Sequence, residues 1–570
     1  MSVQRLSAEL PARRLQVLAD PAVRALATQG LVGLEKEALR VNPDGSVAAT
    51  PHPSVLGSAL THPHITTDFS EALIELVTPA LPDLQAVLDF LRDLHLFVDR
   101  QIGEERLWAA SMPCLINGGA KIPLAQYGSS NAAQMKTVYR RGLGNRYGRV
   151  MQIIAGVHFN FSLPEGFWPL TQSELSTASG SEPATNADAD RSDPAYALRV
   201  RDASYMGMVR NLQRLGWLVP YLFGASPAVC KSFVQDPKTD LESFDAKTFY
   251  YPFATSLRMG DIGYQNRQEE GTGLKANYDS LDAYTRSLTW AIRTPCPHYE
   301  PIGRKVNGRW EQLNDHVLQI ENEYYSTVRP KQLTDWMEFP TLALRRRGIR
   351  YVELRSVDVN LYEPLGIELE QMRFLSLFML YCLLLPSPTI SPRERRWIDS
   401  NEVLAAHRGR EPGLMLQRSD GPIALRAWGR QVLEAMEPLA ALLDEELGGQ
   451  ATAALQAQQF KMAEPEATPS ARILAEMRAR GEGFAEFARR LTERHRDGFK
   501  RLELAPERLA LFQRLADESR QRQAQIEAAD DCDFDTFLAR YFAQTEDQPV
   551  ALGSPFAAAP ASTASTGVSA

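Results

Sequence analysis

The segment Tyr351-Val-Glu-Leu-Arg-Ser-Val-Asp358 alternates polar and apolar residues, as a β-strand with one buried face does. Successive side chains of a strand point to opposite faces, so Glu353 and Arg355 are expected to project together. The residues that alternate with them, Val352 and Leu354, would then pack on the other side. A carboxylate and a guanidinium on one face can hold a cation together with the anion that it neutralises. For this pair alone, a solvent-exposed ion pair between strands is an equally good interpretation.

A second segment, Met151-Gln-Ile-Ile-Ala-Gly-Val-His-Phe-Asn-Phe-Ser162, alternates in the same way. Its large apolar residues Val157, Phe159 and Phe161 are expected to face a core. His158 is then on the polar face of an otherwise apolar strand. A lone histidine is usually a satisfied surface residue. An imidazole is nevertheless an allowed ligand for Mg²⁺ or Mn²⁺, although oxygen ligands are more usual.

Two further stretches contain closely spaced acidic residues, Gly33-Leu-Glu-Lys-Glu37 and Thr66-Thr-Asp-Phe-Ser-Glu-Ala-Leu-Ile-Glu75. Each pattern is weak alone, because two nearby glutamates usually mark a solvated face. Carboxylates that meet across a sheet repel each other unless a hard cation lies between them. We therefore predict that the acidic stretches form the walls of one metal-filled cavity. The acidic residues concerned are Glu35, Glu37, Asp68, Glu71, Glu75 and Glu353.

Arginines are plentiful near these stretches, including Arg258 and the cluster of Arg140, Arg141 and Arg146. A planar guanidinium can bind a phosphate or carboxylate through two parallel hydrogen bonds. Carboxylates, divalent cations and arginines together are the groups used for phosphoryl transfer. The sequence has no GxxxxGK[ST] loop, no HExxH helix and no GxSxG turn. Nucleotide binding would therefore have to use metal ions and arginines.

The overall composition excludes some classes of protein. A net charge of −8 over 570 residues disfavours a general nucleic-acid binder, so no nucleic acid is expected as a partner. The five cysteines are scattered and form no CxxC pair, which predicts no disulfide framework, no zinc knuckle and a reducing cytoplasm. We see no signal peptide. The most apolar run, Phe374–Leu385, is too short to span a bilayer and predicts a buried helix, so no membrane partner is expected.

The character of the sequence changes along the chain. Residues 1–366 mix strand and turn patterns and predict an α+β catalytic body, with a Ser/Thr-rich surface insertion at about 171–194. Residues 367–548 have apolar residues at helical spacing and predict a mainly helical C-terminal portion. Residues 549–570 are of low complexity and predict a disordered tail. Near the start, Asp20-Pro21 predicts a break between two helical segments.

Several strings of the sequence match those of a known family in the same order. They are Gly33–Glu37, Leu56–His62, Ile65–Phe69, Ser111–Cys114, Leu124–Gly128, Asn145–Gly148, Gly156–Ser162, Pro220–Pro227 and Tyr351–Ser356. On these strings the chain resembles the glutamate–cysteine ligases (γ-glutamylcysteine synthetases) of the proteobacterial type. The resemblance extends from about Gly33 to Asn360, with weaker matches through Pro469–Leu474 to Tyr541. So many long strings in the same order make a chance match implausible.

This resemblance implies an α+β fold like that of glutamine synthetase. A curved antiparallel sheet forms a funnel, surrounded by helices and followed by a helical C-terminal portion. The inner face of the sheet holds ATP, metal ions and amino acids. The implied metal ligands, for Mg²⁺ or Mn²⁺, are Glu35, Glu37, Asp68, Glu75, His158 and Glu353. Arg258 and Arg355 are implied as catalytic contacts to phosphate and the glutamyl group. Tyr139, Arg140 and Tyr264 are implied in substrate binding, with the two tyrosines in the cysteine pocket.

The implied reaction is the ATP-dependent joining of the γ-carboxylate of L-glutamate to the α-amine of L-cysteine. It proceeds through γ-glutamyl phosphate, gives γ-glutamylcysteine, ADP and phosphate, and is the first step of glutathione biosynthesis. The resemblance also implies feedback inhibition by glutathione. We expect a cytoplasmic enzyme; the oligomeric state is open, with a monomer as one expectation. A ligase with another amine acceptor and a metal-dependent phosphohydrolase stay as alternatives, while a catalytically inactive binding protein is disfavoured because no motif position is lost.

Overall fold

The computed structural model describes residues 8–116, 118–175, 194–234, 239–263 and 275–546. The predicted tail at 549–570 lies outside these ranges, as does Tyr264. Most of the predicted insertion at 171–194 also lies outside them. Its first residues, however, belong to helix α5 (Phe167–Leu175), in which Thr171 is 1% exposed. An insertion can therefore begin only after Leu175.

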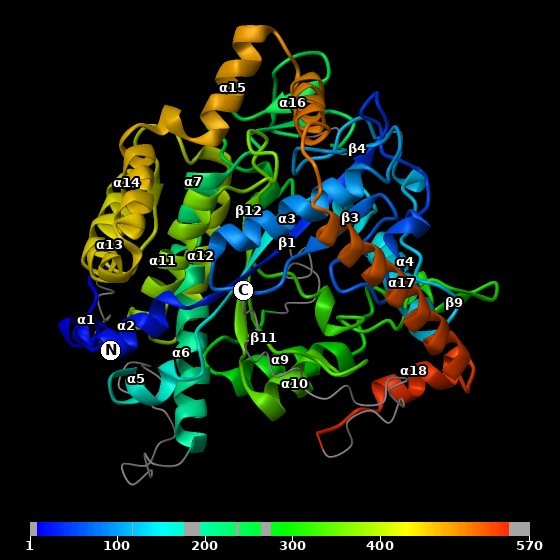
Figure 1. Ribbon diagram of the computed structural model, residues 1–570, viewed down its shortest axis with the longest axis horizontal. Coiled ribbons are helices and arrows are strands. Elements are labelled where there is room, and N and C mark those ends of the chain that lie inside the picture. The colour runs from blue at the N-terminus through cyan, green and yellow to red at the C-terminus, as the bar shows by residue number, and fades with distance from the viewer. Residues whose placement is uncertain (1–7, 117, 176–193, 235–238, 264–274, 547–570) are drawn as a thin grey trace.

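Within the described ranges, seven strands form one antiparallel sheet at the centre of the molecule (Figure 1). The strand order is β11-β12-β5-β1-β3-β2, and β4 pairs with the far end of β1. The fold is therefore α+β. The strands are β1 (Leu31–Val41), β2 (Ile65–Thr67), β3 (Leu73–Val77), β4 (Arg106–Leu107), β5 (Gly156–Ser162), β11 (Val328–Lys331) and β12 (Tyr351–Asp358).

The two segments with clear alternation are neighbouring strands, β5 and β12. Strand β12 has the bounds that the alternation predicts. Strand β5 begins only at Gly156, because Met151–Ile153 forms a short 3₁₀ helix, so the first part of that prediction was wrong. The apolar residues of both strands are buried, as Val157, Phe159 and Val352 illustrate.

Helices cover the sheet and extend it into a larger body. Helix α3 (Leu84–Asp99) packs against β1 and β3, and α6 (Pro194–Leu215) packs against β11 and β12. Helix α7 (Leu218–Phe223) packs against β12. The other α-helices in the described residues before 366 are α1 (Ala12–Ala19), α2 (Pro21–Thr28), α4 (Asn131–Tyr147), α9 (Leu281–Arg293) and α10 (Pro340–Arg347). Small sheets are formed by β6 (Ala228–Cys230), β7 (Glu242–Ser243) and β8 (Thr248–Tyr250), and by β9 (Lys305–Val306) and β10 (Arg309–Trp310).

Beyond residue 366 the described chain is helical except for one small hairpin of β13 (Met415–Leu416) and β14 (Ile423–Ala424). One buried apolar cluster contains side chains from both portions, such as Leu34 and Phe378. The division into two domains near residue 366 stays a prediction. The helices are α11 (Leu369–Leu384), α12 (Pro392–Arg408), α13 (Leu425–Leu447), α14 (Gln450–Ala463), α15 (Pro469–Arg480), α16 (Phe484–Phe499), α17 (Pro506–Ala529) and α18 (Phe534–Phe542).

Two local predictions about helices are confirmed. Helix α1 ends at Ala19 and α2 begins at Pro21, with the Asp20 side chain accepting a hydrogen bond from Ala22 N at 2.8 Å. The apolar run before Pro386 forms α11, most of whose residues are buried. In the described part of the chain, no helix is both long and apolar enough to cross a membrane.

The cysteines differ from the prediction. Cys114 and Cys230 form a disulfide with a Cα–Cα distance of 5.4 Å. They are 116 positions apart in the sequence, so local spacing could not reveal the pair. The fold brings them together because the loop after β4 meets the end of β6. Cys114 is buried, with 1% of its surface exposed.

Candidate active site

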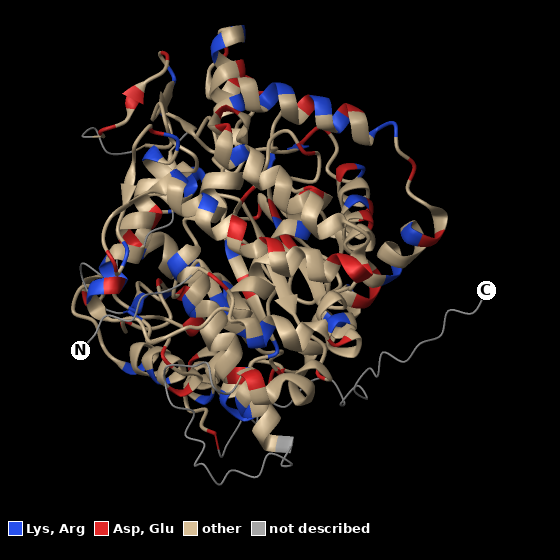
Figure 2. Ribbon diagram, turned by 90° about the vertical axis from the view of Figure 1, so that its left-hand side faces the viewer, with Lys and Arg blue, Asp and Glu red and all other residues tan. Residues whose placement is uncertain are grey.

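Acidic and basic residues are interspersed along the helices in Figure 2. The grouped carboxylates lie instead in a cavity of about 430 Å³ over one face of the sheet. All the site residues that the family resemblance implies and that the structure describes line this cavity. They are Glu35, Glu37, Asp68, Glu75, Tyr139, Arg140, His158, Arg258, Glu353 and Arg355.

The strand register explains why the acidic residues converge. Glu37 of β1 is paired with Glu75 of β3, and Glu35 of β1 is paired with His158 of β5. Glu353 of β12 is paired with Asn160, two residues further along β5. Paired residues of antiparallel strands project from the same face of the sheet. Four strands therefore present their polar residues to one cavity.

The distances at this face are short enough for a shared cation. His158 Nδ1 lies 3.2 Å from Glu35 Oε2 and 3.6 Å from Glu353 Oε1, and His158 Nε2 lies 3.8 Å from Glu37 Oε1. Ligand atoms of Glu35, Glu75 and His158 all lie within 4.8 Å of one another. Oxygen ligands with one imidazole nitrogen suit Mg²⁺ or Mn²⁺.

The electrostatics of the carboxylates favour a cation. Burial, together with the negative charges of Glu35 and Asp68, raises the pKa of Glu75 well above its usual range. Burial also raises the pKa of Glu37. For Glu35, burial opposes ionisation, but the hydrogen bond with His158 brings its pKa below the ordinary value. A divalent cation would let all three carboxylates ionise together.

Glu353 is compensated by positive charges from two strands. It is 1% exposed and contacts Arg355 Nη1 at 3.0 Å and Lys331 Nζ of β11 at 3.1 Å. Burial would raise the pKa of Glu353, but Arg355 and Lys331 outweigh it and lower the pKa. Lys331 was not singled out in the sequence, since one lysine at a strand end has no distinguishing pattern.

The buried carboxylate of Asp358, which was not predicted from the sequence, lies beside the Arg258 guanidinium. Arg258 Nη2 donates to the Arg355 carbonyl at 2.8 Å, and its Nη1 lies 3.6 Å from Asp358 Oδ1. Asp358 also accepts hydrogen bonds from Ala225 N at 2.9 Å and from the hydroxyls of Ser226 at 2.5 Å and Ser256 at 2.9 Å. Asp358 therefore joins three chain segments around Arg258. Its position at the end of the predicted strand was the one indication available from the sequence.

Gly156 is required by the same contacts. A Cβ atom there would lie 2.1 Å from Arg258 Nη2, so no other residue fits without moving the guanidinium. The Gly156 N–H donates to Glu37 Oε2 at 2.7 Å. One glycine thus lets an arginine and a carboxylate of the site approach each other across the backbone.

Tyr139 and Arg140 come from helix α4, which forms another wall of the cavity. The Arg140 guanidinium lies 4.6 Å from the centre of the Tyr127 ring, and its Nε donates to the Asp68 carbonyl. Burial raises the pKa of Tyr139, so its hydroxyl stays protonated at neutral pH.

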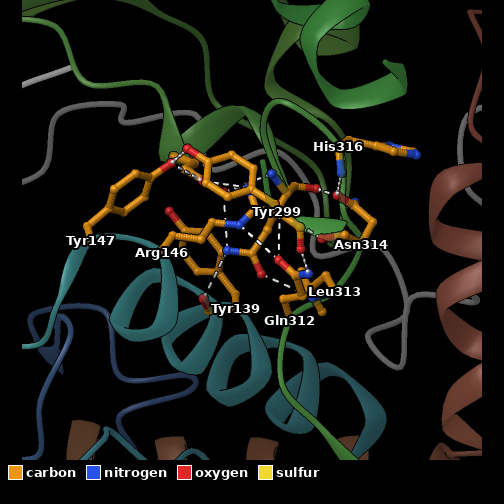
Figure 3. A network of polar contacts seen from close by, with 10 residues as sticks. Tyr139, Arg146, Tyr147, Tyr299, Gln312, Leu313, Asn314 and His316 are labelled. Carbon is orange, nitrogen blue, oxygen red and sulfur yellow. Dashed lines mark hydrogen bonds and ion pairs between the residues drawn. The ribbon is translucent and has the colours of Figure 1, made fainter. Parts of the chain in front are cut away.

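The C-terminal end of α4 is fixed by a buried polar network (Figure 3). Arg146 Nη1 lies 2.8 Å from Glu323 Oε1, and the Tyr147 hydroxyl donates to the same oxygen at 2.7 Å. Arg146 also donates to Gln312 Oε1 at 3.0 Å and 2.9 Å. Gln319 Nε2 donates to the Tyr139 carbonyl at 3.3 Å. Arg146 therefore holds the wall in place and is not directed at a ligand.

One acidic residue of the predicted walls does not belong to the cavity. Glu71 precedes β3, so it does not share a face with Glu75. Its carboxylate accepts hydrogen bonds from His52 N at 2.6 Å and Gln126 N at 2.7 Å. The prediction that Glu71 lines the metal cavity was wrong, because the chain is still in a turn at that position.

The α+β fold presents carboxylates, a histidine and arginines to one cavity, an arrangement typical of an enzyme that handles phosphates with the help of metal ions. The model of the family described as glutamate-cysteine ligase matches residues 15–404, and the chain belongs to this family.

Curated relatives and solved structures agree with that assignment. The glutamate–cysteine ligase of Pseudomonas paraeruginosa is 46% identical over 534 residues, covering 94% of this chain and 98% of the relative. That of Azotobacter vinelandii is 45% identical, covering 94% and 99%. The crystal structure of the Francisella tularensis glutamate–cysteine ligase in complex with AMP has a TM-score of 0.81 and 33% identity, covering 90% of this chain and 97% of that one. A bifunctional glutathione synthetase from Pasteurella multocida shares the fold, with a TM-score of 0.64 and 22% identity over 89% of this chain and 57% of its own.

Proposed function

We propose that this chain catalyses the ATP-dependent ligation of the L-glutamate γ-carboxylate to the L-cysteine α-amine. The reaction passes through γ-glutamyl phosphate and gives γ-glutamylcysteine, ADP and phosphate, the first step of glutathione biosynthesis. The observation that carries this proposal is the cross-strand convergence of carboxylates and His158 beside Arg258 and Arg355. ATP as co-substrate is supported by the AMP bound to the Francisella relative.

The chemistry explains why such a site is needed. A free carboxylate is a poor acyl donor because oxide is a poor leaving group, and phosphorylation by ATP makes it reactive. Mg²⁺ or Mn²⁺, when bound, would supply charge stabilisation to the phosphates. Glu35, Glu37, Asp68, Glu75, His158 and Glu353 are the proposed metal ligands.

The remaining site residues orient the reactants. Arg258 and Arg355, fixed by Asp358 and Glu353, are proposed to bind the transferred phosphoryl group and the glutamyl carboxylate. Tyr139, Arg140 and Tyr264 are proposed to hold the amine substrate. The neutral α-amine attacks the acyl phosphate, and a tetrahedral intermediate collapses to amide and phosphate. Water must be kept away from the acyl phosphate, because it would hydrolyse this intermediate without forming the amide.

Several finer features belong to the same proposal. The antiparallel sheet with its cavity on one face supports a funnel of the glutamine synthetase type. We also propose a cytoplasmic location, a catalytic body that ends near residue 366, and feedback inhibition by glutathione.

The test mixes purified protein, ATP, Mg²⁺, L-glutamate and L-cysteine and identifies the product by mass. We expect γ-glutamylcysteine, with ADP formation that depends on both amino acids. Phosphate release without them would indicate a phosphohydrolase, and a product with another amine would indicate a different acceptor. The Glu353→Ala variant should lose glutamate- and cysteine-dependent ADP formation while staying folded by circular dichroism.

A further inference from the structure

The wall of the cavity beside Tyr139 is completed by a residue from the far end of the chain. Tyr541 lies in helix α18 and lines the cavity together with Tyr139 and Met337. It is 5% exposed. Helix α18 packs against α4, the helix that carries Tyr139. Figure 1 shows α18 at the edge of the molecule, far along the chain from the sheet that carries the carboxylates.

Tyr541 is held firmly in this position. Its ring packs edge to face against Phe339, with 4.8 Å between the ring centres. Three residues further on, Gln544 is 2% exposed and accepts a hydrogen bond from Phe339 N at 3.1 Å. Gln544 Nε2 donates to the Met337 carbonyl at 3.1 Å and to the Tyr541 carbonyl at 2.9 Å. One glutamine side chain therefore ties the end of α18 to the segment 337–339.

Met337 is in an unusual conformation at this wall. Its φ is +60°, in the left-handed region that non-glycine residues rarely adopt. Such a conformation persists only where the surroundings hold it, and it is found disproportionately at ligand-binding positions. Here the Gln544 hydrogen bond holds the carbonyl, and the Met337 side chain lines the cavity.

The chemistry of this wall differs from that of the sheet face. The sheet presents carboxylates, an imidazole and guanidinium groups, which suit ions and phosphates. Tyr139, Met337 and Tyr541 present two aromatic rings and a thioether. Polarisable groups of this kind pack well against a small sulfur-containing side chain. They carry no positive charge with which to bind a phosphate.

We propose that Tyr541 is a specificity-determining residue for the amine acceptor. Its ring limits the size of the acceptor side chain and packs against the thiol of cysteine. This inference rests on the proposed function and adds to it a residue from the C-terminal helix.

The test compares cysteine with S-methyl-L-cysteine, which is larger by one methyl group, as acceptors for four proteins. These are the wild type, Tyr541→Ala, Tyr541→Phe and Phe542→Ala. Phe542 is the matched control, because it lies next in α18 and contacts the Tyr541 ring without lining the cavity. Tyr541→Phe keeps the ring that forms the wall.

We expect Tyr541→Ala to raise the KM for cysteine at least fivefold while the KM for ATP stays within twofold. The ratio of kcat/KM for S-methyl-L-cysteine to that for cysteine should rise about tenfold, the discrimination that one methyl group supports in a tight pocket. Tyr541→Phe and Phe542→Ala should keep both the ratio and the KM for cysteine within twofold of the wild type. If Tyr541→Ala lowers the Tm more than Phe542→Ala does, Tyr541→Leu provides the same comparison in a better-packed helix.

Some outcomes would overturn the inference while leaving the proposed function intact. In these, the wild type makes γ-glutamylcysteine, but Tyr541→Ala leaves the acceptor ratio unchanged or raises the KM for ATP as much as that for cysteine. The second result would place the ring against the nucleotide. A wild-type protein that makes no γ-glutamylcysteine would instead overturn the proposed function, and this inference with it.

Discussion

Two carboxylates in the wall of the same cavity, Glu323 and Glu75, are in opposite environments. Glu323 accepts hydrogen bonds from Arg146 Nη1 at 2.8 Å, the Tyr147 hydroxyl at 2.7 Å and Gln319 N at 2.8 Å. Glu75 faces other carboxylates, and burial and those charges raise its pKa well above the usual range. A buried charge with all its partners stabilises an arrangement of the chain. A buried charge without them is costly, and its presence indicates a bound ion.

The first prediction concerns the uncompensated carboxylate and has the largest expected effect. Glu75→Gln should lower kcat/KM at least about 10³-fold, because a metal ligand is lost where the reaction develops charge. The metal-free variant should be no less stable than the wild type, since one negative charge is removed from a repulsive cluster. Coupled ADP assays and urea unfolding in EDTA measure the two quantities. Turnover near the wild-type value would remove Glu75 from the metal site.

The second prediction concerns the compensated carboxylate. Glu323→Gln leaves the buried guanidinium of Arg146 without its counter-ion, which should lower the free energy of unfolding by about 3 kcal/mol. Urea denaturation measures this loss. Mg²⁺ should still raise the Tm of Glu323→Gln as it does for the wild type, but should not raise that of Glu75→Gln. Equal Mg²⁺ responses in the two variants would contradict the distinction between the carboxylates.

Much of the sheet could be predicted from the sequence, because alternation is a local property. The bounds of β12 and the shared face of Glu353 and Arg355 follow from it directly. The contacts that fix the site are not local, and no sequence pattern marks them. Glu323 meets Arg146 across 177 positions, and Tyr541 joins the cavity wall from a helix that resembles any amphipathic helix.

Asp358 shares a feature with each of these two carboxylates. Like Glu323 it is fully hydrogen-bonded, and like Glu75 it acts at the active site, because it lies beside Arg258. Asp358→Asn keeps an acceptor for some of its donors but removes the charge beside Arg258. We expect kcat to fall about 30-fold with KM values within about threefold, because Arg258 loses its orientation in the transition state. The Tm increase on Mg²⁺ addition should be unchanged. A fall in stability with normal kcat would make Asp358 a purely structural residue.

The smallest predicted effect concerns Glu321, a buried carboxylate that is only partly compensated. It accepts hydrogen bonds from Thr341 N at 2.8 Å and from the Thr341 hydroxyl, yet burial raises its pKa to about 7 from 4.5. Between those two values the folded protein binds more protons than the unfolded one, so stability falls as pH rises through this window and levels off above pH 7.

We expect this carboxylate to contribute a loss of about 2.5 kcal/mol in the free energy of unfolding over that range. Glu321→Gln should remove this part of the pH dependence, because the amide does not titrate. Urea unfolding at a series of pH values compares the slopes of the two proteins. Identical slopes would mean that Glu321 is ionised in the folded protein throughout, and that its two contacts with Thr341 compensate it as fully as Arg146 and Tyr147 compensate Glu323.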